Sequence, residues 1–170
     1  MTAPSFDLKP LSKESIPRAL AKAERYRLLN EPTDAESICM DVLRIDPENQ
    51  EALVMLLLAR TDQFDEQRPD TLQRSKEALA GLRDEYSRAY YEGIIFERRA
   101  KAQLKRGSPG SGYSAYEALR RALDCYQKAA SNRPAANDDA LLRWNACVRM
   151  LESYPQLAPA PAEPVELPLE

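Results

Sequence analysis

The sequence contains no histidine and few glycines or phenylalanines. Without histidine, it lacks the side chain that most often acts as a general base or binds a metal ion. Five glycines and three phenylalanines among 170 residues are few for a β-sandwich or barrel, whose many turns need glycine. No apolar run approaches the roughly 18 residues that span a bilayer. These absences favour an all-α protein and argue against a membrane anchor.

The cysteine and glycine patterns give no indication of a catalytic or metal centre. Cys39, Cys125 and Cys147 form no CxxC pair and lie in apolar helical patterns, so we expect buried, reduced thiols. The segment GSPGSG at 107–112 lacks the lysine and hydroxyl residue of a phosphate-binding loop. The acidic residues include no recognisable pairing with a nucleophile. We therefore predict a protein that is not an enzyme and that binds no metal or cofactor.

The overall charge and the N-terminal sequence limit the partner and the compartment. The net charge is -3, which argues against nucleic acid as the main partner because phosphate binding requires an excess of cations. The N-terminal stretch has no apolar segment of the kind found in secretory signals, so a cytoplasmic location is expected. A basic cluster between Arg98 and Arg106, joined by Arg120 and Arg121, leaves an acidic peptide or RNA as an alternative ligand.

Residues that favour helices are abundant, and their spacing divides the chain into seven predicted helices. Alanine, leucine, arginine and glutamate predominate, and apolar residues recur at helical spacing between breaks rich in proline, glycine and asparagine. The predicted helices begin near residues 14, 33, 48, 71, 87, 113 and 138, with the fourth running to Tyr86. Residues 14–153 are thus predicted to form one helical domain.

The two ends of the chain show no helical period. Residues 1–13 contain two prolines and are predicted to form a flexible arm. Residues 154–170 contain five prolines, which are incompatible with a continuous helix, and we expect a disordered acidic tail. Two roles are open for this tail: a docking motif held extended by its prolines, or a solubilising end.

The first predicted hairpin, formed by the first two helices, has a spaced pattern of small and aromatic residues. Ala23 occupies a small position, with the aromatic Tyr26 three residues later. In the second helix Ala35 and Cys39 lie four residues apart, and Pro47 ends the unit. Small residues at such spacing allow two helices to cross closely.

The third predicted hairpin repeats this pattern with a longer connection. Gly93 and Phe96 occupy the small and aromatic positions of its first helix. Ala122 and Tyr126 reproduce the second-helix pair, and Pro134 closes the unit. The longer distance between the two halves indicates an extended first helix and an inserted loop at 107–112.

These two copies resemble the tetratricopeptide repeat (TPR) family over roughly residues 16–151. The middle hairpin departs from the pattern, with Leu57 and Arg60 at its small and aromatic positions. Ala35, Ala78 and Ala122 are spaced by more than 40 residues, whereas the family period is about 34. The resemblance implies an α-solenoid of three hairpins with degenerate, lengthened repeats and a C-terminal capping helix. A nonrepeating helical bundle is the alternative.

The resemblance also implies a function: a scaffold or adaptor that holds a protein or peptide in a groove lined by the first helix of each hairpin. Packing in the core is the alternative role for Trp144, and a solvated surface position is the alternative for Arg98 and Arg143. Self-association into a homo-oligomer, through Leu57, Leu58 and other apolar faces, is a further hypothesis. The residues expected to contact the partner are Tyr90, Tyr91, Ile94, Glu97, Arg98, Arg143, Trp144 and Asn145.

Overall fold

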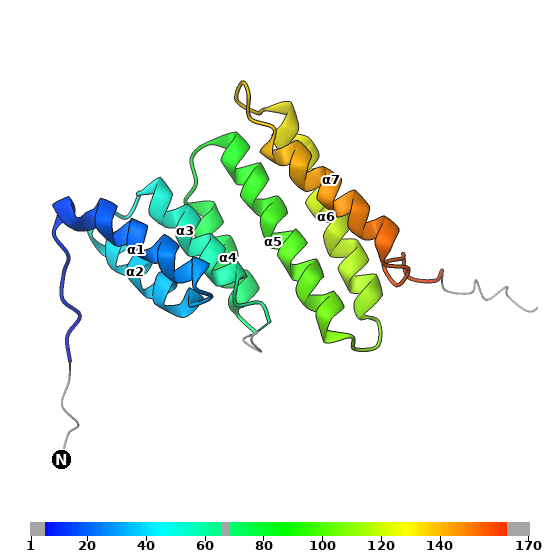
Figure 1. The fold of residues 1–170 in the computed structure, drawn as a ribbon, viewed down its shortest axis with the longest axis horizontal. Coiled ribbons are helices and arrows are strands. Elements are labelled where there is room, and N and C mark those ends of the chain that lie inside the picture. The colour runs from blue at the N-terminus through cyan, green and yellow to red at the C-terminus, as the bar shows by residue number, and fades with distance from the viewer. Residues whose placement is uncertain (1–5, 66–68, 163–170) are drawn as a thin grey trace, which may run out of the picture.

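The computed structural model describes residues 6–65 and 69–162, and every regular element within these ranges is helical. In this described part of the chain, a short 3-10 helix, η1 (Lys13–Ser15), precedes seven α-helices that follow one another in a row (Figure 1). The all-α prediction is confirmed. The helices are α1 Ile16–Leu28, α2 Pro32–Ile45, α3 Gln50–Thr61, α4 Thr71–Ala80, α5 Glu85–Arg106, α6 Ser111–Ser131 and α7 Asp139–Ser153.

Local sequence explains several of the helix ends. The Asn49 side chain accepts a hydrogen bond from the backbone N–H of Ala52, at 2.9 Å, and so caps the start of α3. Proline lies in the first turn of α1 and of α2, where no N–H donor is needed. Gly107 ends α5 with φ +64°, a left-handed conformation that glycine adopts without a steric penalty.

The boundary between α4 and α5 differs from the prediction. The apolar period suggested a fourth helix running to Tyr86, but α4 ends at Ala80 and Tyr86 belongs to α5. Asp84 determines the new start, because its carboxylate accepts a hydrogen bond from the backbone N–H of Ser87 at 2.8 Å. Similarly, α6 begins at Ser111, inside the predicted link at 107–112.

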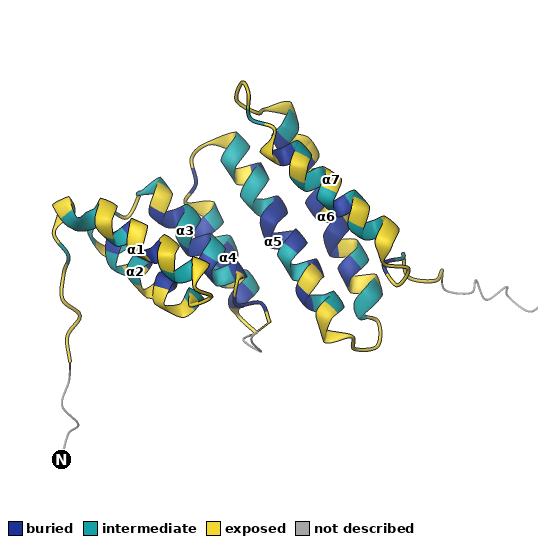
Figure 2. Ribbon diagram, viewed as in Figure 1, coloured by how far each residue is buried: buried dark blue, intermediate teal, exposed yellow. Residues whose placement is uncertain are grey.

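Consecutive helices pack against each other along the whole row. In addition α1 contacts α3, and α3 contacts α5, which places these odd-numbered helices side by side. The most extensive packing is between α5 and α6, the two longest helices. Buried residues lie along the inner stripes of the helices, whereas exposed residues lie along their outer sides (Figure 2). The chain therefore buries its apolar surface through neighbouring helix pairs.

The core of the first two hairpins is built from small residues. Ala23, Ala35 and Cys39 are fully buried and belong to one cluster, so α1 and α2 approach closely where the pattern predicted it. Leu57 is also fully buried in this cluster, together with Ile95 of α5. The hypothesis of self-association through Leu57 is therefore wrong, because this side chain has no exposed surface.

The core of the last three helices depends on a close contact between α5 and α6. Gly93 lies against the ring of Tyr126, and a Cβ atom added at Gly93 would be 2.5 Å from the Tyr126 Cε1 atom. Tyr126 is fully buried and shares its cluster with Ala122 and with Cys147 of α7. The absence of a side chain at Gly93 therefore allows the tyrosine to occupy the interface.

The segment after α7 begins as part of the packed domain. Leu157 is 6% exposed and packs in the cluster of the last three helices, although it lies within the predicted tail. The carbonyl oxygen of Gln156 lies so close to Gly112 that an added Cβ atom would be 2.3 Å away. Residues 154–157 thus cover the start of α6, whereas part of the predicted tail, 163–170, lies outside the described residues.

The segment before η1 has no helix between residues 6 and 12, and Leu11 packs partly against the small cluster formed by Leu20, Val42 and Ala52. Residues 1–5 of the predicted arm lie outside the described residues. Within the described ranges, none of the helices combines the length and the apolar character needed to cross a membrane.

Replacing Gly93 with alanine tests the contact between α5 and α6. Alanine normally favours a helix interior over glycine by about 1 kcal/mol. Here the new Cβ would clash with a buried ring, and overpacking of this kind costs about 1–3 kcal/mol. We expect Gly93→Ala to lower the free energy of unfolding measured by urea denaturation. The exposed control Ser114→Ala should change it by less than about 0.5 kcal/mol, and a stabilised Gly93→Ala protein would contradict the packing.

Candidate binding face

Charged side chains connect the odd-numbered helices on one side of the row. Asp62, just after α3, accepts a hydrogen bond from the Arg27 Nε atom of α1 at 2.7 Å. Its other carboxylate oxygen bonds Arg98 of α5. Arg98 also donates to the Thr61 hydroxyl at 2.7 Å and to the Leu58 carbonyl at 3.1 Å. One carboxylate thus connects α1, the end of α3, and α5. We call this side of the row, marked by Arg27, Asp62 and Arg98, the groove face.

A second carboxylate joins α5 to α6 and α7. Glu97 has no exposed side-chain surface. Its Oε2 atom accepts a hydrogen bond from the Tyr126 hydroxyl at 2.6 Å. Its Oε1 atom lies 2.6 Å from the Lys101 Nζ atom and 3.1 Å from a guanidinium nitrogen of Arg143. Because a buried charge without partners would be strongly unfavourable, these three donors are what allow Glu97 to be buried.

The surroundings shift the pKa values of these groups. Burial alone would raise the pKa of Glu97, but the hydrogen bonds from Lys101 and Tyr126 and the nearby cations lower it below its ordinary value. Burial lowers the pKa of Arg98 and raises that of Tyr126. At neutral pH the face therefore carries ionised Glu97 and neutral Tyr126. The Arg143 Nε atom is buried and has no hydrogen-bond partner among the described residues.

A hollow of about 330 Å³ opens between the end of α3, the middle of α5 and α7. Four cationic side chains line it, together with the carboxylates of Asp62 and Asp65. Lys105 pairs with Asp65 at 2.6 Å, and the buried Glu97 pairs with Lys101 and Arg143. The hollow therefore has a small excess of positive charge, although the whole chain is negative. We call it the basic hollow, and its charged lining consists of Asp62, Asp65, Arg98, Lys101, Lys105 and Arg143.

Three tyrosines follow one another along the first half of α5. The rings of Tyr86 and Tyr90 are stacked with centroids 5.8 Å apart, and Tyr91 meets Tyr90 edge-on at 5.1 Å. The Tyr86 hydroxyl donates to the side-chain oxygen of Asn137, before α7, at 3.3 Å. Burial raises the pKa of Tyr90 to about 12, so its hydroxyl is neutral at physiological pH. These rings form a partly exposed aromatic surface.

The structure brings together only some of the residues predicted to contact a partner. Glu97, Arg98 and Arg143 meet at or beside the basic hollow. Asn145 is exposed on α7 but lies about 200° around the helix from Arg143, so it faces away from the hollow and not toward it as predicted. Ile94 is 4% exposed and belongs to the core, so it does not reach the surface as predicted. Trp144 is half-buried and packs against that same core.

The groove residues predicted from the sequence leave out two residues that organise this site, although one of them, Lys101, belongs to the predicted basic cluster. Lys101 lies one helical turn after Glu97, and this i, i+4 spacing of opposite charges is a signal that the sequence does contain. Asp62 gives no comparable signal. Its partners, Arg27 and Arg98, lie about 35 residues away on either side, and only the packing of three helices brings them together.

A second buried carboxylate joins α2 to α3 and α4. Glu36 of α2 is 4% exposed and pairs with Arg60 of α3, at 3.0 Å, and with Arg74 of α4. Gln63 donates to its other oxygen at 2.8 Å. Arg60, at the position where the repeat pattern predicts an aromatic residue, instead pairs with Glu36, and this cluster joins α2, α3 and α4.

Comparison with protein-family models, with curated proteins and with solved structures gave no match. Within residues 6–65 and 69–162, no group of three or more cysteine, aspartate or glutamate side chains is arranged to hold a metal ion. The three cysteines are free, and burial raises the pKa of each thiol to about 12. Such thiols are protonated at neutral pH and are therefore weak nucleophiles.

The pairing of Glu97 predicts a specific dependence of stability on pH. A carboxyl group whose pKa is lowered by folding stabilises the native state above its unfolded pKa, near 4.5 for glutamate. This contribution is lost as the pH falls through the lower folded value. Glu97→Gln should reduce the free energy of unfolding at pH 7 by about 1–3 kcal/mol.

The difference between wild type and Glu97→Gln should shrink when urea denaturation is repeated at decreasing pH below about 4.5. Glu24→Gln is a suitable control because Glu24 is exposed on α1. A difference that stays constant with pH would show that Glu97 is not held as an ionised group.

Proposed function

We propose that this chain is a protein-binding scaffold: a degenerate TPR-like array whose odd-numbered helices receive a segment of a partner protein on the groove face. Close hairpin crossings at Ala23, Ala35 and Gly93 support the array, because these small residues pack at the positions expected from the repeat pattern. Burial of apolar surface between successive hairpins also supports it.

The basic hollow is the observation that carries the proposal. It is a concave, positively charged site formed by α3, α5 and α7 together. Its side chains are held by the bonds of Asp62 and Glu97, so the donors are ordered before a partner arrives. Such ordering reduces the entropy lost on binding. In the first half of the same helix, the tyrosines of α5 supply the side-chain type that often contributes most to binding energy.

A charge reversal tests the groove face. Lys105 is 73% exposed in the basic hollow, so it can be replaced with little effect on the core. We expect Lys105→Glu to reduce partner recovery at least about fivefold, a loss of about 1 kcal/mol or more. The measurement is quantitative mass spectrometry of proteins cross-linked to the purified chain.

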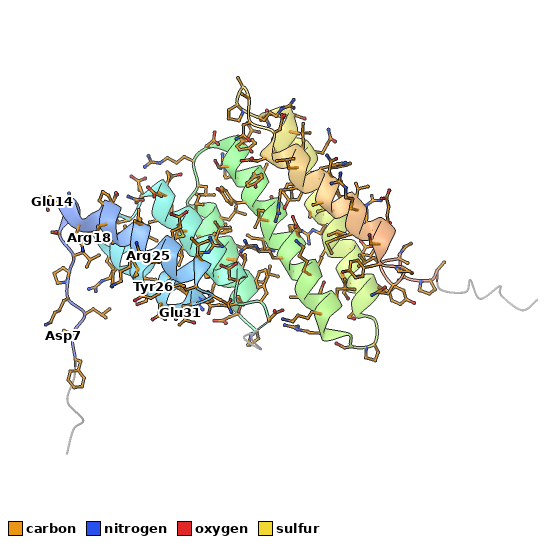
Figure 3. All side chains as sticks on the ribbon, in the orientation of Figure 1. Asp7, Glu14, Arg18, Arg25, Tyr26 and Glu31 are labelled. Atoms are coloured by element: carbon orange, nitrogen blue, oxygen red, sulfur yellow. The ribbon has the colours of Figure 1, made fainter. Side chains whose placement is uncertain are left out.

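The matched control is Arg18→Glu, which changes the net charge by the same amount. Arg18 is exposed on α1, at the end of the row away from α7 (Figure 3). Partners of the groove face should remain bound to the control. If both variants lose the same proteins, or neither loses any, the groove face is not the binding surface.

Self-association is a second candidate, because two adjacent leucines are exposed at the end of α1. Leu28 is 82% exposed and Leu29 is 61% exposed. Apolar side chains at such positions are the ones that a second copy could bury. If the chain forms dimers here, sedimentation velocity should show a concentration-dependent increase in mass that Leu28→Glu with Leu29→Glu abolishes. A monomer at all concentrations would eliminate this candidate.

A further inference from the structure

The basic run in the second half of α5 is divided between two sides of the helix. Arg98, Lys101 and Lys105 line the basic hollow, and each pairs with a carboxylate there. Arg99 and Arg106 project from a different side, toward α4 and α6, because each successive helical residue turns by about 100°. The single basic cluster expected from the sequence is therefore two separate surfaces.

The second surface contains two adjoining hollows, of about 450 and 350 Å³. Arg99 and Gln103 line both of them, so the two hollows meet over α5. The first extends to the start of α4, and the second extends to the first turns of α6. We call them together the α4–α6 groove, whose principal lining residues are Leu72, Arg99, Gln103, Arg106, Tyr113 and Arg121.

Among the described residues, the α4–α6 groove has more positive than negative charge, and few of its charged groups are paired with one another. Three arginines line it, against one carboxylate, Glu117, among the described residues. Arg99 has no hydrogen bond or ion pair with another described residue. Arg121 lies over an aromatic ring, 4.2 Å from the centroid of Phe96, and Arg106 uses one nitrogen to bond the Phe64 carbonyl. Their remaining donors are available to an anion.

Gln103 lies where the two hollows meet and favours a ligand that carries a hydrogen-bond donor. Its Oε1 atom is buried and has no hydrogen-bond partner within the described part of the chain. A buried acceptor without a donor is unfavourable, so a ligand that brings an N–H group would be favoured at this position. The groove thus offers a hydrogen-bond acceptor for an N–H group and several donors for anionic groups. Leu72 and Tyr113 add an apolar wall.

We propose that the α4–α6 groove binds an acidic, partly apolar peptide segment of a partner protein. The peptide's carboxylates would pair with Arg99, Arg106 and Arg121, and one of its backbone N–H groups would bond Gln103. A peptide fits better than nucleic acid. Nucleic acid binding depends on neutralising phosphates, and three arginines on a chain of net charge -3 neutralise few of them. This site is separate from the groove face and does not depend on it.

Peptide display on the full chain tests the proposal. A library of short random peptides is selected against wild type and against Arg99→Glu with Arg106→Glu, and the recovered peptides are sequenced. Wild type should enrich peptides rich in aspartate and glutamate. The best of these should lose about tenfold or more in affinity for the double variant, measured by fluorescence anisotropy, because two charge-assisted contacts become repulsive.

The control is Arg18→Glu with Lys105→Glu, which makes the same change in net charge on α1 and in the basic hollow. It should keep the affinity of wild type. If acidic peptides are not enriched, or bind the Arg99 and Arg106 variant as tightly as wild type, the proposal is wrong. If only the Lys105 control loses them, acidic peptides bind the groove face instead, and this inference fails while the proposed function stands.

Further measurements separate loss of binding from loss of folding, and peptide binding from RNA binding. Arg99→Glu alone should also weaken binding of the selected peptide. Because Arg99 has no partner within the described residues, the thermal unfolding of this variant should match that of wild type. Gln103→Leu should reduce the affinity of the selected peptide by about 2- to 10-fold, the value of one hydrogen bond. Binding of a single-stranded RNA that Arg99→Glu abolishes, without selection of acidic peptides, would assign the groove to nucleic acid and overturn the proposal.

Discussion

The Glu97 carboxylate is the interaction on which the second half of the molecule depends. It is buried where α5, α6 and α7 meet, and each of these helices supplies a donor: Lys101, Tyr126 and Arg143. The Tyr126 hydroxyl reaches the carboxylate only because Gly93 leaves room for the ring. A small residue on one helix thus determines the position of an aromatic residue on the next, and the aromatic residue stabilises a charge that holds a third helix.

The same helix, α5, connects the two halves of the chain. Ile95 packs in the core of the first hairpins, whereas Phe96 packs in the core of the last three helices. Between these apolar contacts, Arg98 reaches across to Asp62, which also binds Arg27 of α1. Because α5 is 22 residues long, it has room for both cores and for a polar side on each flank. Both proposed binding surfaces follow from this central position.

Much of the fold could be predicted from the sequence, because helices depend on local spacing. The helix positions around Pro47, Gly107 and Pro134 follow from breakers that act on their own neighbours in the chain. The end of α4 could not be placed in this way, because the apolar period continues past Gly81 and the Asp84 cap competes with it. Leu157 likewise follows a proline-containing segment and is buried only because α6 offers it a surface.

The binding surfaces were less predictable from the sequence, because they depend on contacts between segments that are distant in the chain. Helical spacing placed Arg98 and Arg143 on the groove face, but it could not show that Ile94 is covered or that Asp62 joins them. By itself the sequence determined an all-α chain, its seven helices and the small residues that let them cross. Only the tertiary structure decided which charges meet, and it divided one basic run into two surfaces. Helix formation depends on neighbours in the chain, whereas pairing of charges depends on the packing of helices distant in sequence.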